Sequence, residues 1–156
     1  MTYTTTLATI LATLTIAGAA EAQVTHAPAP YLAEAAQWAP APPVLPAGAE
    51  IAVLSGNPFA EGHFVLRLKL PASYNVPAHI HSGDELITVI SGEFNIGHGE
   101  ALDRDAATLL TAGGFVELPA GHPHFAWTSS ETIVQIHGPG PFDITYIDPA
   151  DNPVGQ

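Results

Sequence analysis

The sequence predicts an all-β domain, either a β-sandwich or an antiparallel β-barrel. Three observations favour this class: apolar and polar residues alternate in short segments, turn-forming residues recur about every 8–12 positions, and helical periodicity is scarce. Of the 156 residues, 47% are hydrophobic and 12% are charged, which supplies enough apolar surface for one core. The length suits a single domain, so we do not expect a multidomain enzyme. The high hydrophobic and low charged content argue against a disordered chain.

Residues 1–22 are expected to be a secretory signal peptide. Leu7 to Ala20 is an apolar run interrupted only by Thr and Gly, and Ala20-Glu21-Ala22 is the small-x-small triplet typical of signal-peptidase cleavage. The run is shorter than the roughly 20 residues of a membrane-spanning helix. Residues 1–6 lack Lys and Arg, so an uncleaved anchor or a buried N-terminal helix is the alternative. We expect a secreted or periplasmic protein that leaves the membrane after cleavage.

Residues 23–49 form an arm that is rich in Pro and Ala. Because proline fixes φ and lacks an N–H donor, we expect this arm to be extended or irregular. Tyr31 to Trp38 could form a short helix between two groups of prolines, with Trp38 docked on the domain.

Residues 50–149 carry the strand signals, and residues 150–156 are a C-terminal tail. Phe64, Leu66, Leu68 and Leu70 alternate with more polar residues, which predicts a strand with one buried face. Ala101 to Leu110 is expected to form a turn or a short helix. Further strands are expected over residues 86–90, 93–98, 115–118, 124–128, 132–137 and 142–147. The aromatic residues expected in the core are Phe94, Phe115, Phe125, Trp127 and Phe142.

The charge and cysteine content exclude several kinds of partner and site. The formal net charge is −12, and the only basic side chains are Arg67, Lys69 and Arg104. Nucleic acids and anionic membranes are therefore not expected as partners, since both need clustered Lys and Arg. The chain has no Cys, so disulfides, iron–sulfur clusters and thiolate zinc sites are impossible. A metal would have to be held by the carboxylates or by the eight His, the commonest metal ligand.

Metal-ligating residue types gather in the segment from His79 to Glu85. Residues i and i+2 of a strand face the same side, so His79 and His81 can direct two imidazoles at one point. The turn at residues 82–84 can then bring Glu85 back towards them. Two imidazoles and a carboxylate suit Fe, Mn, Ni, Cu or Zn as divalent ions. His124, which follows a Pro119-x-Gly121 turn, is the candidate for a further ligand from a distant strand.

At these positions the sequence resembles the cupin superfamily, over about residues 50–149. The first cupin motif, His-x-His-x3-Glu-x6-Gly, is matched by His79, His81, Glu85 and Gly92. The second motif, Gly-x5-Pro-x-Gly-x2-His, is matched by Gly113, Pro119, Gly121 and His124. Two positions depart from the family pattern: Ser73 stands where Gly is expected, and Thr128 stands where Asn is expected.

The resemblance implies a single jelly-roll antiparallel β-barrel with one divalent transition metal inside, bound by His79, His81, Glu85 and His124. Cupins with this ligand set include dioxygenases, isomerases, decarboxylases and lyases. We therefore expect a metal-dependent oxidoreductase, dioxygenase-like, or a lyase that acts on a small organic molecule. The alternative is a cupin that binds or senses a metal or small ligand without turnover, and a structural cupin without metal is a third. A homodimer that exchanges its N-terminal arms is also implied.

The remaining polar residues leave several alternatives open. Gln135 and His137 share one face of a predicted strand, and if that face points inward they could contact a ligand or orient a metal ligand. His122 could orient a metal ligand or lie at the mouth of the site. His98 is expected in the core or at the rim, and His63 in solvent. Tyr146 and Glu117 are candidate acid–base groups, and Glu85 could instead pair with Lys69.

Overall fold

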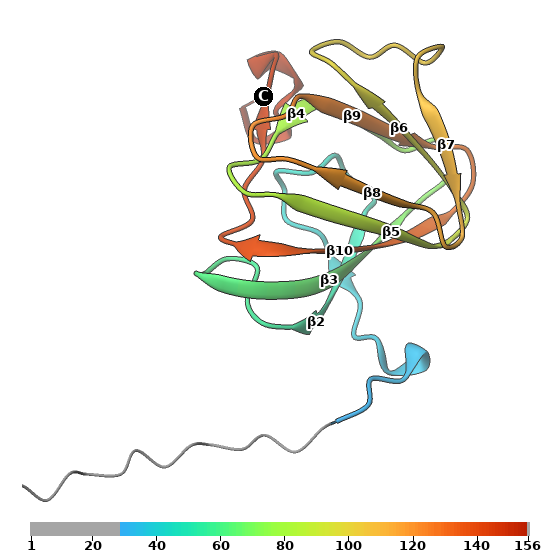
Figure 1. The fold of residues 1–156 in the computed structure, drawn as a ribbon, viewed down its shortest axis with the longest axis vertical. Helices are drawn as coiled ribbons and strands as arrows, with labels where there is room; N and C mark the ends of the chain where they lie inside the picture. The colour runs from blue at the N-terminus through green and yellow to red at the C-terminus, as the bar shows by residue number, and fades with distance from the viewer. Residues whose placement is uncertain (1–28, 156) are drawn as a thin grey trace, which may run out of the picture. The chain divides into compact units, whose positions relative to one another are not determined.

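The computed structural model describes residues 29–155. The predicted signal peptide and the first residues of the arm therefore lie outside the described residues. From Tyr31 onward the described chain forms one compact unit. Two antiparallel sheets make up this unit (Figure 1), which confirms the prediction of an all-β jelly-roll fold.

The larger sheet has six strands in the order β1-β2-β3-β10-β5-β8. Its strands are β1 (Ala39–Pro40), β2 (Glu50–Ser55), β3 (Gly62–Leu70), β10 (Thr132–Gly140), β5 (Glu85–Ser91) and β8 (Phe115–Leu118). The smaller sheet has the order β11-β4-β9-β6-β7. Its strands are β11 (Thr145–Tyr146), β4 (Asn75–Ile80), β9 (His124–Thr128), β6 (Glu93–His98) and β7 (Thr108–Thr111).

The helical content of the described residues is limited to three short 3-10 turns, namely η1 (Ala33–Ala35), η2 (Pro149–Asp151) and η3 (Pro153–Gly155). None of the helices in this part of the chain is long and apolar enough to cross a membrane. The segment 101–110 contains no helix: residues 101–107 form a loop with a turn at residues 105–106, one of the two expected alternatives, and residues 108–110 belong to β7. Of the strand expected over 142–147, only the two residues of β11 form.

The core lies between the two sheets. Phe64, Leu66, Leu68 and Leu70 of β3 are all buried in it, as their alternation predicts. From β10, Val134 and Ile136 face the same core. β10 pairs with both β3 and β5, and therefore holds the centre of the larger sheet.

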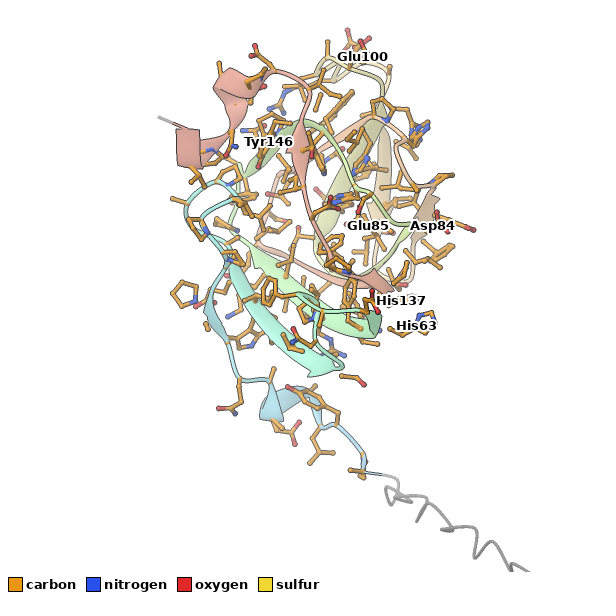
Figure 2. All side chains as sticks on the ribbon, turned by 90° about the vertical axis from the view of Figure 1, so that its left-hand side faces the viewer. His63, Asp84, Glu85, Glu100, His137 and Tyr146 are labelled. Atoms are coloured by element: carbon orange, nitrogen blue, oxygen red, sulfur yellow. The ribbon has the colours of Figure 1, made fainter. Side chains whose placement is uncertain are left out.

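The suggestion that Gln135 and His137 point inward is wrong. They alternate with the buried Val134 and Ile136 along β10 and so occupy the outer face of the sheet. The Nε–H of Arg67 on β3 donates a hydrogen bond to Oε1 of Gln135, over 3.2 Å. Figure 2 shows His137 at the periphery of the domain, close to the exposed His63.

The aromatic residues divide between two regions of the fold. Phe94 lies in the core and Phe142 packs against it, as expected. Phe115 is not a core residue, since it is 51% exposed on the edge strand β8. Phe125 is fully buried but lies outside the main core cluster, stacked on Trp127. The guanidinium of Arg104 lies 4.7 Å from the Trp127 ring centroid, so the loop before β7 reaches over these aromatics.

Gly97 on β6 is required by the packing of Phe125. A Cβ at this position would lie 2.2 Å from Cε2 of Phe125 and 2.3 Å from its Cζ. No carbon–carbon contact can be that short, so the absence of a side chain lets the Phe125 ring lie flat on the β6 backbone. This contact belongs to the pairing of β6 with β9, the strand on which His124 stands.

The two positions that depart from the cupin motifs contact each other. Ser73 has φ of 61°, the left-handed conformation that glycine adopts most easily. The Ser73 N–H donates to the Thr128 carbonyl oxygen at 3.1 Å, and the Tyr74 N–H donates to Thr128 Oγ1 at 3.1 Å. The Thr128 hydroxyl in turn donates to the Pro71 carbonyl oxygen at 2.6 Å. Thr128 therefore holds the turn that Ser73 makes.

The arm from residue 38 to residue 46 packs against the barrel. The Lys69 ammonium lies 4.4 Å from the Trp38 ring centroid, and β1 pairs with β2. Two tyrosine hydroxyls hold the segment that follows. Tyr146 donates to the Val44 carbonyl oxygen at 2.7 Å, and Tyr74 donates to that of Pro46. Leu45 lies between them and packs against the core.

Candidate metal centre

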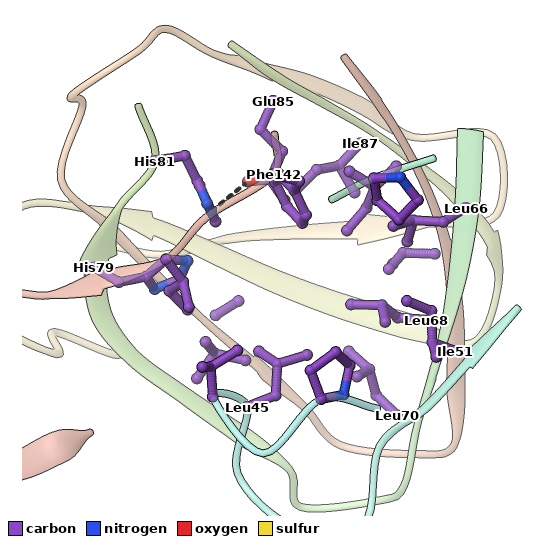
Figure 3. Close-up of a pocket in the computed structure, with 18 of the residues that line it drawn as sticks. Leu45, Ile51, Leu66, Leu68, Leu70, His79, His81, Glu85, Ile87 and Phe142 are labelled. Carbon is purple, nitrogen blue, oxygen red and sulfur yellow. Dashed lines mark ion pairs between the residues drawn. The ribbon is translucent and has the colours of Figure 1, made fainter. Parts of the chain in front are cut away.

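Four side chains from β4, β5, β9 and the turn after β4 meet inside the barrel. Figure 3 labels three of them, His79, His81 and Glu85. His79 stands near the end of β4, and His81 follows that strand directly. Glu85 begins β5, and His124 begins β9. β4 and β9 are neighbours with His79 opposite His124. The Gly121 N–H donates to the His81 carbonyl oxygen at 2.8 Å, which fixes the turn before β9 against His81.

The ligand atoms converge. One ring nitrogen from each of His79, His81 and His124 lies within 4.8 Å of the others. Oε2 of Glu85 is 3.3 Å from Nε2 of His81 and 3.3 Å from Nε2 of His124. All four residues are buried.

Each histidine is oriented through its other ring nitrogen. Nδ1 of His79 contacts the Pro77 carbonyl oxygen at 2.7 Å, and Nδ1 of His124 contacts that of His122 at 2.9 Å. Nδ1 of His81 contacts the Asp143 carbonyl oxygen. A carbonyl only accepts, so each Nδ1 carries a proton, and whenever the ring is neutral its lone pair lies on Nε2. This is the arrangement in which metal-ligating histidines are held in proteins.

Asp143 is fixed in turn by Ser82. Oδ1 of Asp143 accepts hydrogen bonds from the backbone N–H and the hydroxyl of Ser82, both at 2.8 Å. Burial acts to raise the pKa of the Asp143 carboxyl, but these two hydrogen bonds outweigh it and hold the pKa below its usual value. Asp143 therefore stays ionised, and its backbone carbonyl is held in place for His81.

Three of the four site residues have shifted pKa values. Burial, together with the neighbouring His124 and His81, lowers the pKa of His79 to about 3, so this ring is neutral. Burial acts against the ionised form of Glu85, but its close contacts with His124 and His81 prevail and lower its pKa to about 2. Burial also opposes a charge on His81, but its contact with Glu85 is stronger and raises the pKa of His81. The site thus holds one carboxylate among three imidazoles.

Two buried polar atoms of the site have no hydrogen-bond partner: Nε2 of His81 and Oε2 of Glu85. A buried polar atom without a partner costs about 1–3 kcal/mol, and a charged one costs more. Both atoms face the point where the ligand atoms converge. Their separation of 3.3 Å is close to that of two ligand atoms that each lie about 2.0–2.2 Å from one ion. The residues present therefore fit a divalent metal.

The site opens on an apolar cavity of about 80 Å³ (Figure 3). Its walls are mainly aliphatic side chains from both sheets, and the arm adds Pro42, Val44 and Leu45. The charged or imidazole side chains that line it are the four site residues and Asp143, with no Lys or Arg. The Phe142 ring stacks on His81, with centroids 4.6 Å apart and planes at 17°. The cavity can accept a small molecule whose surface is largely apolar.

The family model for the ChrR cupin-like domain matches residues 28–143. The chain belongs to this cupin family. No curated protein matches the chain significantly.

Solved structures similar to this cupin share its fold at low sequence identity. A proposed acetylacetone dioxygenase from Methylibium petroleiphilum PM1 is 17% identical with a TM-score of 0.61, covering 83% of this chain and 88% of that one. The polyketide cyclase RemF from Streptomyces resistomycificus is 16% identical with a TM-score of 0.57, covering 67% and 75%. KdgF from Halomonas sp. is 14% identical with a TM-score of 0.55, covering 73% and 96%. Similarity at this level shows the fold alone.

The cupin fold brings together His79, His81, Glu85 and His124, the four residues selected from the sequence. Glu85 does not pair with Lys69, whose ammonium contacts Glu50 at 2.5 Å instead. His98 and His122 do not line the cavity, and neither does Tyr146. The hydroxyl of Tyr146 holds the arm, and burial, aided by Asp151, raises its pKa to about 12. Glu117 is exposed on β8.

Sequence reasoning missed Pro77 and Asp143, which orient His79 and His81; His122 was a candidate for such a role, but it orients His124 through its backbone carbonyl. Their contribution is a backbone carbonyl, which every residue type possesses, so no residue identity signals it. The side chain of Asp143 is the exception, because it fixes its own carbonyl through Ser82.

Proposed function

We propose that this cupin binds one divalent transition metal through His79, His81, Glu85 and His124 and transforms a small, uncharged organic molecule beside it. The observation that carries the proposal is the pair of partnerless atoms, His81 Nε2 and Glu85 Oε2, at the point where the three imidazoles meet. Structural carboxylates and histidines in a core are normally hydrogen-bonded to each other or to backbone groups. Here the free lone pairs face inward, as a metal requires.

The chain's own residues have distinct roles in this proposal. His79, His81 and His124 supply neutral nitrogen ligands, and Glu85 supplies the one negative charge. Leu45, Phe142 and the aliphatic walls exclude water and select an apolar substrate. The lining offers no cation for a phosphate or carboxylate group, so sugar phosphates and organic acids fit poorly.

The reaction class that we propose is oxidoreductase chemistry of the dioxygenase type, or a lyase reaction. A redox-active metal at the site would supply O2 chemistry, and Zn²⁺ would supply Lewis-acid chemistry. Two of the fold relatives, the proposed acetylacetone dioxygenase and the polyketide cyclase, are named for carbonyl compounds. Such compounds are uncharged and form enols, which suits a cavity of this lining. We also propose, from residues 1–22, that the protein is secreted or periplasmic.

A non-catalytic module that binds a metal or small ligand is the second candidate. It is favoured by the scarcity of acid–base groups: apart from the four site residues, Asp143 is the one ionisable side chain that lines the cavity. Binding of a ligand without its conversion would support this alternative.

The first test is elemental analysis of the full chain, purified without a histidine tag, beside His79→Ala/His124→Ala. The matched control is His63→Ala/His137→Ala, which removes two histidines from the outside of the larger sheet. We expect the cavity site to hold about one Fe, Mn, Ni, Cu or Zn ion per chain in the wild type and in the control. The His79→Ala/His124→Ala variant should lose this ion. Equal metal contents in all three proteins would contradict the proposal.

The second test separates an enzyme from a binding module. The metal-loaded protein is incubated with acetylacetone, and O2 consumption and product masses are followed. A blocked analogue, 3,3-dimethylpentane-2,4-dione, cannot form the central enol and is the control substrate. Conversion of acetylacetone that is lost in His124→Ala would support the enzyme. Binding without turnover would support the module.

A further inference from the structure

Two histidines outside the cavity face each other at the end of the smaller sheet. His98 is the last residue of β6, and His122 lies in the turn between β8 and β9. Nδ1 of His98 is 3.0 Å from Nε2 of His122, and the two rings are 5.0 Å apart at 68°. Neither residue lines the cavity. His98 is exposed and His122 is half-buried, so solvent reaches the pair.

The backbone around the pair holds both rings in position. The register of β6 on β9 places His98 opposite His124. Next to it, the Gly99 N–H donates to the Pro123 carbonyl oxygen at 2.8 Å. The His122 N–H donates to the Pro119 carbonyl oxygen at 3.0 Å, which closes the turn. Because these bonds fix both Cα positions, a ligand that bridges the rings costs little additional ordering of the backbone.

We propose that His98 and His122 form a second, exterior site for a divalent transition metal. Two imidazole nitrogens 3.0 Å apart match two adjacent ligands that each lie about 2.0–2.1 Å from one ion. In the metal-free protein one ring donates its N–H to the other. When an ion binds, the donor ring carries its proton on its other nitrogen, so both facing nitrogens offer a lone pair and both rings stay neutral. Solvent can complete the coordination, since His98 is exposed.

The chemistry of the pair favours Cu²⁺. Imidazole suits Cu, Zn and Ni, and affinity among these ions is highest for Cu²⁺. The formal net charge of −12 raises the concentration of cations near the surface. The exterior pair is also independent of the interior ligands in its side chains, because His122 contacts His124 through its backbone carbonyl. Replacing the His98 ring therefore leaves the interior hydrogen bonds in place.

The test counts copper equivalents in the full chain by equilibrium dialysis against Cu²⁺ followed by elemental analysis. The variants are His98→Ala and, as a matched control, His63→Ala, which removes an exposed histidine from β3. We expect the wild type and His63→Ala to bind one more equivalent than His98→Ala. The EPR spectrum of that equivalent should show nitrogen coupling that disappears in His98→Ala. A second variant, His122→Ala, should lose the same equivalent.

Equal copper binding by the wild type and His98→Ala would overturn the proposal. So would an equal loss in His63→Ala and His98→Ala, because that result indicates adventitious binding to any exposed histidine. The interior site is counted separately through His79→Ala/His81→Ala, which should lose a different equivalent and keep the one that depends on His98. Failure of either site therefore leaves the other measurable.

Discussion

Acidification should destabilise the metal-free protein through one buried histidine. His79 is 5% exposed, and burial, with the nearby His124 and His81, lowers its pKa to about 3. In the unfolded chain the same ring titrates near 6.5. Between these two pH values His79 binds a proton in the unfolded state but not in the folded state. Stability therefore falls as the pH drops from about 6.5 towards 3.

The magnitude follows from the two pKa values. A pH of 4.5 is two units below the pKa of about 6.5 in the unfolded chain. At this pH the His79 ring is protonated in the unfolded state and still neutral in the folded state. Each unit contributes about 1.4 kcal/mol, so His79 alone should remove about 2.7 kcal/mol of unfolding free energy between pH 7.5 and pH 4.5. His81 acts in the opposite direction, since its raised pKa favours the protonated folded state at low pH.

The contribution of His79 is isolated by a difference between proteins. Urea unfolding in the presence of a chelator is measured at pH 7.5 and pH 4.5 for the wild type, His79→Gln and His63→Gln. We expect the loss of stability on acidification to be about 2.7 kcal/mol smaller in His79→Gln than in the wild type. His63 is exposed, so His63→Gln should follow the wild type. Parallel pH dependence of His79→Gln and the wild type would refute the reasoning, because it would mean that His79 is protonated within the fold.

Three further outcomes are expected. Glu85→Gln removes the site's negative charge, so metal affinity at pH 7.5 should fall roughly tenfold or more; unchanged affinity in a competition assay would remove Glu85 from the ligand set. When the free metal concentration is about a hundred times its Kd, removal of the metal with a chelator should lower the melting temperature by roughly 10 °C. An unchanged melting temperature in scanning fluorimetry would contradict this expectation. Gly97→Ala should cost about 1–3 kcal/mol in urea unfolding because its Cβ overlaps the Phe125 ring, and a stability equal to that of the wild type would contradict this packing.

The four residues of the candidate centre could be chosen from the sequence because local geometry brings three of them together. Two strand residues at i and i+2 share a face, and a short turn returns Glu85 to them. His124 could not be placed by local geometry, and it was selected through the resemblance of its motif to cupins. In the structure it lies opposite His79 across β4 and β9.

The inward face of β10 could not be predicted because apolar residues occupy both sides of this strand. Ile133 shares the outer face with Gln135 and His137, whereas Val134 and Ile136 face the core. Three of the four residues 133–136 are apolar, so the alternation of apolar and polar residues does not show which face of the strand is buried. The strand's position between β3 and β5 decides which face is buried.

Phe125 is buried, as expected, but the contacts that bury it outside the main core cluster could not be predicted. Its parity places it on the side of β9 opposite to His124, where a residue of a barrel would normally meet solvent. It is buried because Gly97 leaves room for its ring, with Trp127 stacked beside it and Arg104 over Trp127. These contacts join residues that lie far apart in the sequence.

The charge of the proposed centre restricts what can bind beside it. Three neutral imidazoles and one carboxylate leave a divalent ion with a net charge of about +1 in a cavity that is otherwise aliphatic. A net charge buried among apolar groups is costly unless it is paired. No Lys or Arg lines the cavity, so a permanently anionic substrate would find no cationic side chain beside the metal. A molecule that never ionises would leave the net positive charge of the metal centre unpaired. A neutral compound that enters through the apolar walls and can lose one proton, such as an enol or a phenol, satisfies both conditions. The comparison of acetylacetone with its blocked analogue is therefore also a test of the electrostatics of Glu85 and its three histidines.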